Sequence, residues 1–149
     1  MTRFHDFIQA FTQLMDQADG DEARIFMQGK QLLSELIRQD DWLPAKFSHS
    51  SGERYQQYLL YCDPQARFSV VSFVWGPGHA SPIHDHTVWG MVGVLRGAEI
   101  CEEFERNPAT GDLRASGKHQ LLPGDIDLVS PRIGDIHRVS NALTDRPTV

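Results

Sequence analysis

The sequence contains few cysteines and no long apolar run, and these absences exclude several classes of protein. Only 2 cysteines, Cys62 and Cys101, occur among 149 residues, so a disulfide-stabilised secreted scaffold is not indicated. The first 17 residues mix acids and glutamines with apolar residues, unlike a signal peptide. No apolar run approaches the ~18 residues that span a membrane. We therefore expect free thiols, a cytoplasmic location and no membrane contact.

Positive charge is also scarce. The chain has 14 lysines and arginines against 20 acidic residues, which gives a net charge of −6, and its basic residues form no cluster. A protein that binds nucleic acid usually carries a basic patch, so nucleic acid is not expected as a partner. Small molecules are the expected partners, and the sequence does not determine the oligomeric state.

The first 45 residues carry two helical patterns. Apolar residues recur at helical spacing within 4–15 and again within 25–37, and Asp21 is placed to cap the second helix. Pro44 restricts Leu43 to extended geometry and ends this region. We interpret residues 1–45 as a helical lead-in whose apolar faces pack into a core.

From about residue 55 the pattern changes to short segments rich in β-branched and aromatic residues, separated by glycine and proline turns. These segments are 57–62, 67–75, 89–96, 98–105, 118–122, 125–130 and 137–140. Short strands without helical spacers are typical of an antiparallel sandwich or barrel. The predicted class is mainly β, in one domain over residues 1–149.

Two of the seven histidines, His84 and His86, are separated by one residue. In an extended segment their side chains point to the same side and Asp85 to the other, so the two imidazoles can chelate a metal. The pair alone is weak evidence, since such pairs also arise by chance on exposed strands.

The surrounding residues make the prediction stronger. Gly78, His84, His86 and Gly97 match the first motif of the cupin superfamily, and Gly134, His137 and Asn141 match the second. The chain thus resembles a cupin, which implies a small jelly-roll-like β-barrel over residues 55–149 with His84, His86 and His137 as metal ligands. The other histidines, His5, His49, His79 and His119, match no ligand position.

The acidic ligand of most cupins is missing here, because Gly90 and Met91 stand where a glutamate is expected. Three neutral imidazoles leave a divalent ion with its full charge, which favours an anionic ligand such as a thiolate. Asp85 and Asp135 are candidates to orient the ligand histidines, although ordinary turn and surface roles explain them equally well.

A three-histidine cupin of this kind resembles the cysteine dioxygenase family, most closely in FVWGPGHASPIHDHTVWGMVGVLRG, residues 73–97. The resemblance implies Fe(II) as cofactor and the addition of both atoms of O2 to a small thiol carboxylic acid, giving a sulfinate. It identifies no catalytic residue beyond the metal ligands. A metal-dependent cupin that binds a small molecule without turnover is the alternative of a different class.

Two positions narrow the choice of substrate within this family. Gly90 stands where animal cysteine dioxygenases carry a cysteine that is crosslinked to a tyrosine. Gln57 stands where cysteine-specific enzymes carry an arginine that binds the substrate carboxylate. If the alignment slips by one residue, Gln56 takes this position, so the residue is a glutamine in either case. Glutamine resembles the bacterial branch that prefers 3-mercaptopropionate, and L-cysteine is the second candidate substrate. The family continues with a Ser-x-His-x-Tyr strand beyond the position of Val149, so we expect a barrel truncated at its C-terminus.

Overall fold

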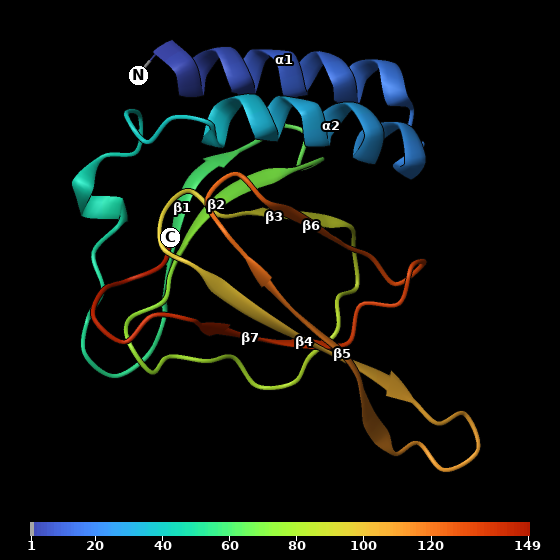
Figure 1. Cartoon of the computed structure of the whole chain (residues 1–149). Coiled ribbons are helices and arrows are strands. Elements are labelled where there is room, and N and C mark those ends of the chain that lie inside the picture. Colours follow the sequence, from blue (N-terminus) through green and yellow to red (C-terminus); the bar gives the residue numbers. More distant parts are fainter. Residues whose placement is uncertain (1) are drawn as a thin grey trace.

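The computed structural model describes residues 2–149 and places two helices side by side over one end of the strands (Figure 1). Helix α1 spans Thr2–Ala18 and helix α2 spans Glu22–Ile37, followed by a short 3-10 turn, η1, at Ala45–Phe47. The side chain of Asp21 accepts a hydrogen bond from the backbone amide of Arg24 at 3.2 Å, which confirms the predicted cap. None of the helices in this described range is long and apolar enough to cross a membrane.

The apolar faces of the helices form the main core, as the periodicity predicts. The buried cluster contains Phe7, Phe11, Leu14, Ala18, Ile25, Leu36 and, from the β region, Phe68. Helix α2 approaches the strands closely at Gly29, where an added Cβ would lie 2.7 Å from the Cε of Met91. A small residue at position 29 therefore lets the helical layer seat directly on the β region.

Seven strands follow, and all of their pairings are antiparallel. Their bounds are β1 Gln56–Cys62, β2 Ser69–Val74, β3 Gly90–Gly93, β4 Glu99–Arg106, β5 Leu113–Leu121, β6 Ile126–Val129 and β7 His137–Asn141. They form a β1-β2 pair, a β3-β6 pair and a three-stranded sheet in the order β5-β4-β7. The predicted mainly β class with antiparallel sheets is confirmed.

Residues 2–149 do not form a closed barrel of the kind expected from the sequence, and the three sheets stay separate. Isolated bridges pair Trp75 with Thr148, Ala80 with Ser140 and His84 with His137. The segment between β2 and β3 contains Pro77 and Pro82, which have no backbone N–H to donate to a continuous ladder. It therefore contacts β7 at separate points instead of adding a strand.

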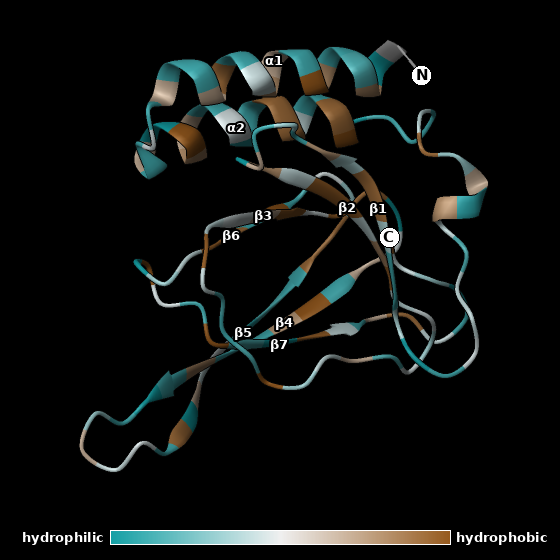
Figure 2. Ribbon diagram, turned by 180° about the vertical axis from the view of Figure 1, so that it is seen from behind, coloured by the Kyte–Doolittle hydropathy of each residue, from teal (hydrophilic) through white to brown (hydrophobic). Residues whose placement is uncertain are grey.

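One strand is longer than expected. The predicted segment 118–122 is the end of β5, which begins at Leu113 and forms with β4 a hairpin that projects from the body (Figure 1). The outer part of this hairpin is hydrophilic (Figure 2). Its residues show little β-propensity, so only the pairing with β4 reveals the strand.

Candidate metal centre

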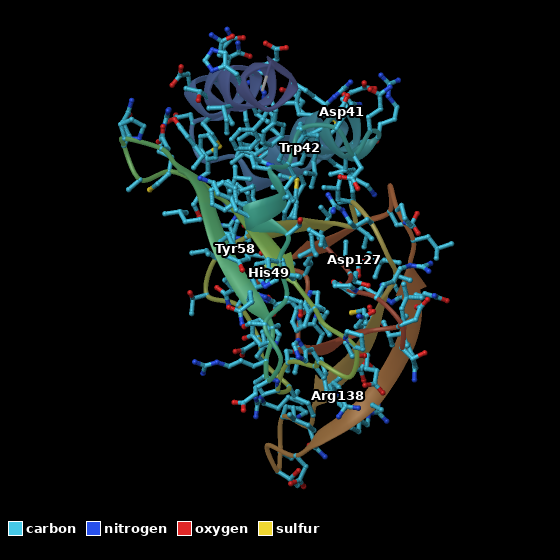
Figure 3. The ribbon with its side chains drawn as sticks, turned by 90° about the vertical axis from the view of Figure 1, so that its left-hand side faces the viewer. Asp41, Trp42, His49, Tyr58, Asp127 and Arg138 are labelled. Atoms are coloured by element: carbon cyan, nitrogen blue, oxygen red, sulfur yellow. The ribbon has the colours of Figure 1, made fainter. Side chains whose placement is uncertain are left out.

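His84, His86 and His137 lie together, although fifty residues of chain separate His86 from His137. The backbones of His84 and His137 form two reciprocal hydrogen bonds of 2.9 Å, which fix the loop against β7. On β7 the neighbouring Arg138, labelled in Figure 3, is exposed and pairs with Glu102 of β4, whereas His137 is buried. Alternation along the strand therefore directs His137 to the inner side, toward the loop histidines.

The three imidazoles can share one ion. One nitrogen from each ring lies within 4.8 Å of the others, and the Nε2 atoms of His84 and His137 are 3.1 Å apart. The ring centroids are 5.0 Å apart for His84 and His86, 4.6 Å for His84 and His137, and 5.0 Å for His86 and His137. The expected extended segment around His84 and His86 is a loop with a single bridge, yet both side chains converge as predicted.

The Nδ1 atoms of the loop histidines are held on the outer side of the cluster. His84 Nδ1 lies 3.0 Å from the carbonyl oxygen of Pro82, and His86 Nδ1 lies 2.9 Å from Oδ2 of Asp135. A carbonyl and a carboxylate only accept hydrogen bonds, so each Nδ1 carries the proton and donates it. The lone pair of each Nε2 is then free for a metal, the arrangement found around ligating histidines.

His137 is the most buried of the three histidines, with 7% of its surface exposed. Burial, reinforced by the positive charge that His84 and His86 would carry, lowers the pKa of His137 to about 4. At neutral pH its imidazole is uncharged, which is the form that binds a metal. Its Nδ1 lies 3.5 Å from the Sγ of Cys101, so this thiol takes the place that Asp135 has beside His86.

The cluster contains no carboxylate among the described residues. Asp135 is buried but touches the outer nitrogen of His86, and Asp85 is exposed, so only Asp135 has the contact expected of an orienting residue. Gly90 lies at the start of β3, where an added Cβ would be 2.9 Å from Cγ2 of Val129. The group that could hold a metal ion here consists of the imidazoles of His84, His86 and His137.

Asn141, the last residue of the second motif, has a structural environment. Its amide nitrogen donates to the carbonyls of Trp75 at 2.8 Å and Arg146 at 3.0 Å. Its side-chain oxygen accepts bonds of 2.8 Å from the amide of Leu143 and the hydroxyl of Thr148. Asn141 therefore fastens the end of β2 and the segment 143–148 to the strand that carries His137.

Gln57 is exposed on the face of the β1-β2 pair that also carries Phe73, its partner across the strands. The opposite face is covered by the segment around η1, where Tyr58 donates to the carbonyl of His49 at 2.8 Å (Figure 3). Gln56 lies on that covered face and bonds the carbonyl of Arg54 at 3.0 Å. No hydrogen bond within residues 2–149 engages the Gln57 side chain or joins it to the histidines.

A second group of donor atoms was missed by the sequence interpretation. Cys101, His119 and Asp127 bring a thiol, an imidazole and a carboxylate within 4.8 Å of one another. The two cysteines are free, as predicted, with Cys62 exposed and Cys101 buried. Cys101 and His119 face each other only because of the register of β4 with β5, which no local pattern in the sequence reveals.

No protein family model matches the chain. Cysteine dioxygenase type 1 of Danio rerio is 27% identical over 112 residues, which are 73% of this chain and 54% of that protein. The chain thus spans about half the length of the relative that it matches. This weak homology supports the cysteine dioxygenase family.

Among solved structures, the chain matches Peruvianin-I, a cysteine peptidase from Thevetia peruviana latex. The sequence identity is 12% and the TM-score 0.45, over 73% of this chain and 68% of the peptidase. A likeness at this level carries no argument about function.

Proposed function

We propose that this protein is a thiol dioxygenase that binds Fe(II) through His84, His86 and His137. The observation that carries the proposal is the convergence of these three imidazoles without a carboxylate. The weak homology to a cysteine dioxygenase points to the same chemistry. In the proposed reaction, a thiol and O2 combine to a sulfinic acid that contains both oxygen atoms, so no further reductant or oxidant is needed.

The ligand set explains why a thiol is the expected substrate. Three neutral donors leave a divalent ion with its full positive charge, which favours an anionic ligand over a neutral one. When bound, Fe(II) supplies Lewis acidity toward the thiol sulfur and one-electron chemistry toward O2. A carboxylate ligand would lower the charge of the ion and occupy a position that a substrate needs.

The chain's own residues prepare this site. The Pro82 carbonyl and the Asp135 carboxylate hold the protons of His84 and His86 on Nδ1, so that each Nε2 is ready to coordinate. Burial keeps His137 uncharged near neutral pH. The site therefore requires little rearrangement to receive an ion.

For the substrate, we propose 3-mercaptopropionate, with Gln57 as the residue that binds its carboxylate. The amide of Gln57 is exposed, and no hydrogen bond within the described part of the chain uses it, so it is free to donate to a ligand. A glutamine offers one neutral donor, whereas an arginine offers two charge-assisted bonds. This weaker contact disfavours L-cysteine, whose ammonium group the metal charge repels.

For the architecture, we propose one cupin-like domain over residues 1–149, with the lead-in at 1–45 and the β region at 55–149. The helical layer packed on the β region and the isolated bridges to β7 support this assignment. The bridge between His84 and His137 would then join the two motifs of the fold at the metal.

The metal assignment is tested by iron content and iron affinity. Changing His84, His86 or His137 to alanine is expected to abolish Fe(II) binding at this site, because two imidazoles bind far more weakly than three. His5→Ala is the control, since His5 is exposed on α1. Full iron occupancy in His137→Ala would contradict the assignment.

The activity is tested by oxygen uptake and sulfinate yield with each thiol over a concentration series. We expect a higher kcat/KM for 3-mercaptopropionate than for L-cysteine, and Gln57→Arg should narrow the difference. Gln56→Arg is a matched control, because Gln56 lies on the opposite face of β1. A tenfold preference for L-cysteine, about 1.4 kcal/mol, would contradict the substrate proposal. Thiol binding without oxygen uptake would favour a non-catalytic binding module.

A further inference from the structure

The group formed by Cys101, His119 and Asp127 lies beside the three-histidine cluster but is separate from it. Cys101 on β4 faces His119 on β5 directly across the strand pair, and Asp127 comes from β6. Nε2 of His119 is 2.6 Å from Oδ2 of Asp127. One donor atom of each residue lies within 4.8 Å of the others, so three strands bring a thiol, an imidazole and a carboxylate to one point.

This donor set has the composition of a zinc site. Zinc binds thiolate, imidazole and carboxylate ligands in tetrahedral geometry, with ligand atoms about 3.4 Å apart. The hydrogen-bonded pair of His119 and Asp127 would have to separate by less than about 1 Å to meet this spacing. Three protein ligands leave the fourth position for water or a further carboxylate.

The charges around the group favour a cation. Glu99 lies on the same face of β4 as Cys101 and is 5% exposed, and no hydrogen bond within residues 2–149 reaches its carboxylate. Burial, together with the charge of Asp127, raises the pKa of Glu99 to about 7. Glu103 approaches Nδ1 of His119 at 3.9 Å. Asp127, Glu99 and Glu103 lie around His119, and Lys30 is the one cation among the described residues that line the same pocket. A divalent ion would offset the negative charge of these acidic groups.

The thiol of Cys101 is buried beside acidic residues. Burial and the neighbouring acidic residues raise its pKa to about 12, so it is not a free thiolate nucleophile at neutral pH. A bound metal deprotonates a coordinating thiol outright. The Nδ1–H of His137, 3.5 Å away, can donate to the resulting thiolate, a contact that is compatible with metal coordination.

An ion can reach the group from outside. His119 and Asp127 line a pocket of about 330 Å³. The side chains of His119 and Asp127 remain 39% and 30% exposed, whereas Cys101 is buried behind them with 3% of its surface exposed. In Figure 3, Asp127 lies to the right of Tyr58 and β1. The imidazole and the carboxylate of the group are therefore accessible from solvent.

We propose that Cys101, His119 and Asp127 form a second metal site, distinct from the three-histidine site, whose donors suit zinc. The proposal does not depend on iron binding or on dioxygenase activity at the first site. The thiol gives it a spectroscopic signature that three histidines alone cannot produce.

Titration of the metal-free chain with Co²⁺, a spectroscopic substitute for zinc, tests the proposal. We expect two Co²⁺ per chain and a near-ultraviolet thiolate-to-cobalt band from one of them. Cys101→Ser, His119→Ala and Asp127→Asn should each remove or strongly weaken the band, with at least a tenfold loss of affinity at this site. Competition with Zn²⁺ should abolish the band in the wild-type protein.

Two control variants show which thiol and which site produce the band. Cys62→Ser removes the other, exposed thiol, and His86→Ala disables the first site, so both should keep the band. Absence of the band in the wild type, its loss in Cys62→Ser, or its persistence in the Cys101, His119 and Asp127 variants would overturn the proposal. Loss in His86→Ala would also overturn it, by assigning the thiolate to the three-histidine ion. If Cys101→Ser fails to fold, the more exposed His119→Ala, with its fold checked by circular dichroism, decides.

This titration also separates the two proposals. A first site that binds no iron and oxidises no thiol would leave the cobalt band of the second site unchanged. Conversely, a missing cobalt band would leave oxygen uptake by the iron-loaded protein unaffected.

Discussion

Oδ2 of Asp135 lies 2.9 Å from Nδ1 of His86, so a residue two positions before His137 in the sequence orients His86. The side chain of Asp135 is 5% exposed and that of His86 is 27% exposed. The contact joins the loop that carries His86 to the segment that precedes His137, the first residue of β7. The orientation of His86 therefore depends on a residue outside its own loop.

This contact predicts a role for Asp135 in metal affinity. Asp135→Ala should weaken Fe(II) binding by about 10–100-fold, because the His86 ring loses the acceptor that fixes its tautomer and orientation. Asp135→Asn should cost less, since its amide oxygen can still accept from Nδ1. Calorimetric titration of each metal-free variant measures the effect.

Asp85→Ala is the matched control, because Asp85 is adjacent to His86 in sequence but exposed. If Asp85→Ala and Asp135→Ala lowered the affinity equally, general charge near the site would explain the loss, and the orienting role of Asp135 would be wrong.

The sequence predicts the helices and most strands well because their apolar periodicity is strong. It does not predict the first half of β5, because residues such as Arg114, Ser116 and Gly117 show little β-propensity. This part of the strand forms only through its pairing with β4. The convergence of His137 on His84 and His86 follows from the family motifs, since their spacing alone does not place β7 beside the loop.

The second donor group shows the other limit of the sequence. Cys101, His119 and Asp127 meet through the register of β4 with β5 and the placement of β6, and each residue alone looks ordinary. Asn141 is the opposite case, because the sequence motif singles this residue out but does not show what the residue does. The structure explains its presence by four hydrogen bonds to backbone and Thr148.

Asn141 is therefore expected to matter for stability. Asn141→Ala should lower the free energy of unfolding by about 2–4 kcal/mol, because it removes these bonds and leaves partly buried partners unsatisfied. Denaturant unfolding of the metal-free protein measures this. Asn107→Ala is the control, since the side-chain oxygen of Asn107 accepts hydrogen bonds from the backbone amides of Ala109 and Thr110 at the exposed hairpin tip. An unchanged midpoint in Asn141→Ala would contradict the structural role.

The missing carboxylate at Gly90 leads to a prediction about charge. Gly90→Glu should weaken thiol binding and turnover more than Gly90→Gln, because an added negative group near the ion would lower its positive charge. Both variants place the same Cβ 2.9 Å from Cγ2 of Val129, so the steric cost is shared and the comparison isolates charge. The measurement is oxygen uptake with 3-mercaptopropionate, and equal rates in the two variants would contradict the charge argument.

Glu99 gives a prediction about the pH dependence of stability. Its pKa is raised to about 7 by burial and by Asp127, from an ordinary value of 4.5. Between these values the folded chain holds a proton that the unfolded chain has lost, so Glu99 makes the fold less stable as pH rises through this window. The shift corresponds to a loss of about 3 kcal/mol at most between pH 4.5 and pH 7.

Glu99→Gln should remove this dependence. In the metal-free protein, the variant is expected to match the wild type near pH 5 and to exceed its stability at pH 8 by up to about 3 kcal/mol. Denaturant unfolding at a series of pH values, with a chelator present, measures the difference. Glu105→Gln is the control, because Glu105 is exposed on the projecting hairpin and pairs only with Arg114. A difference between Glu99→Gln and the wild type that is the same at pH 5 and pH 8 would show that the Glu99 carboxyl does not titrate in this window.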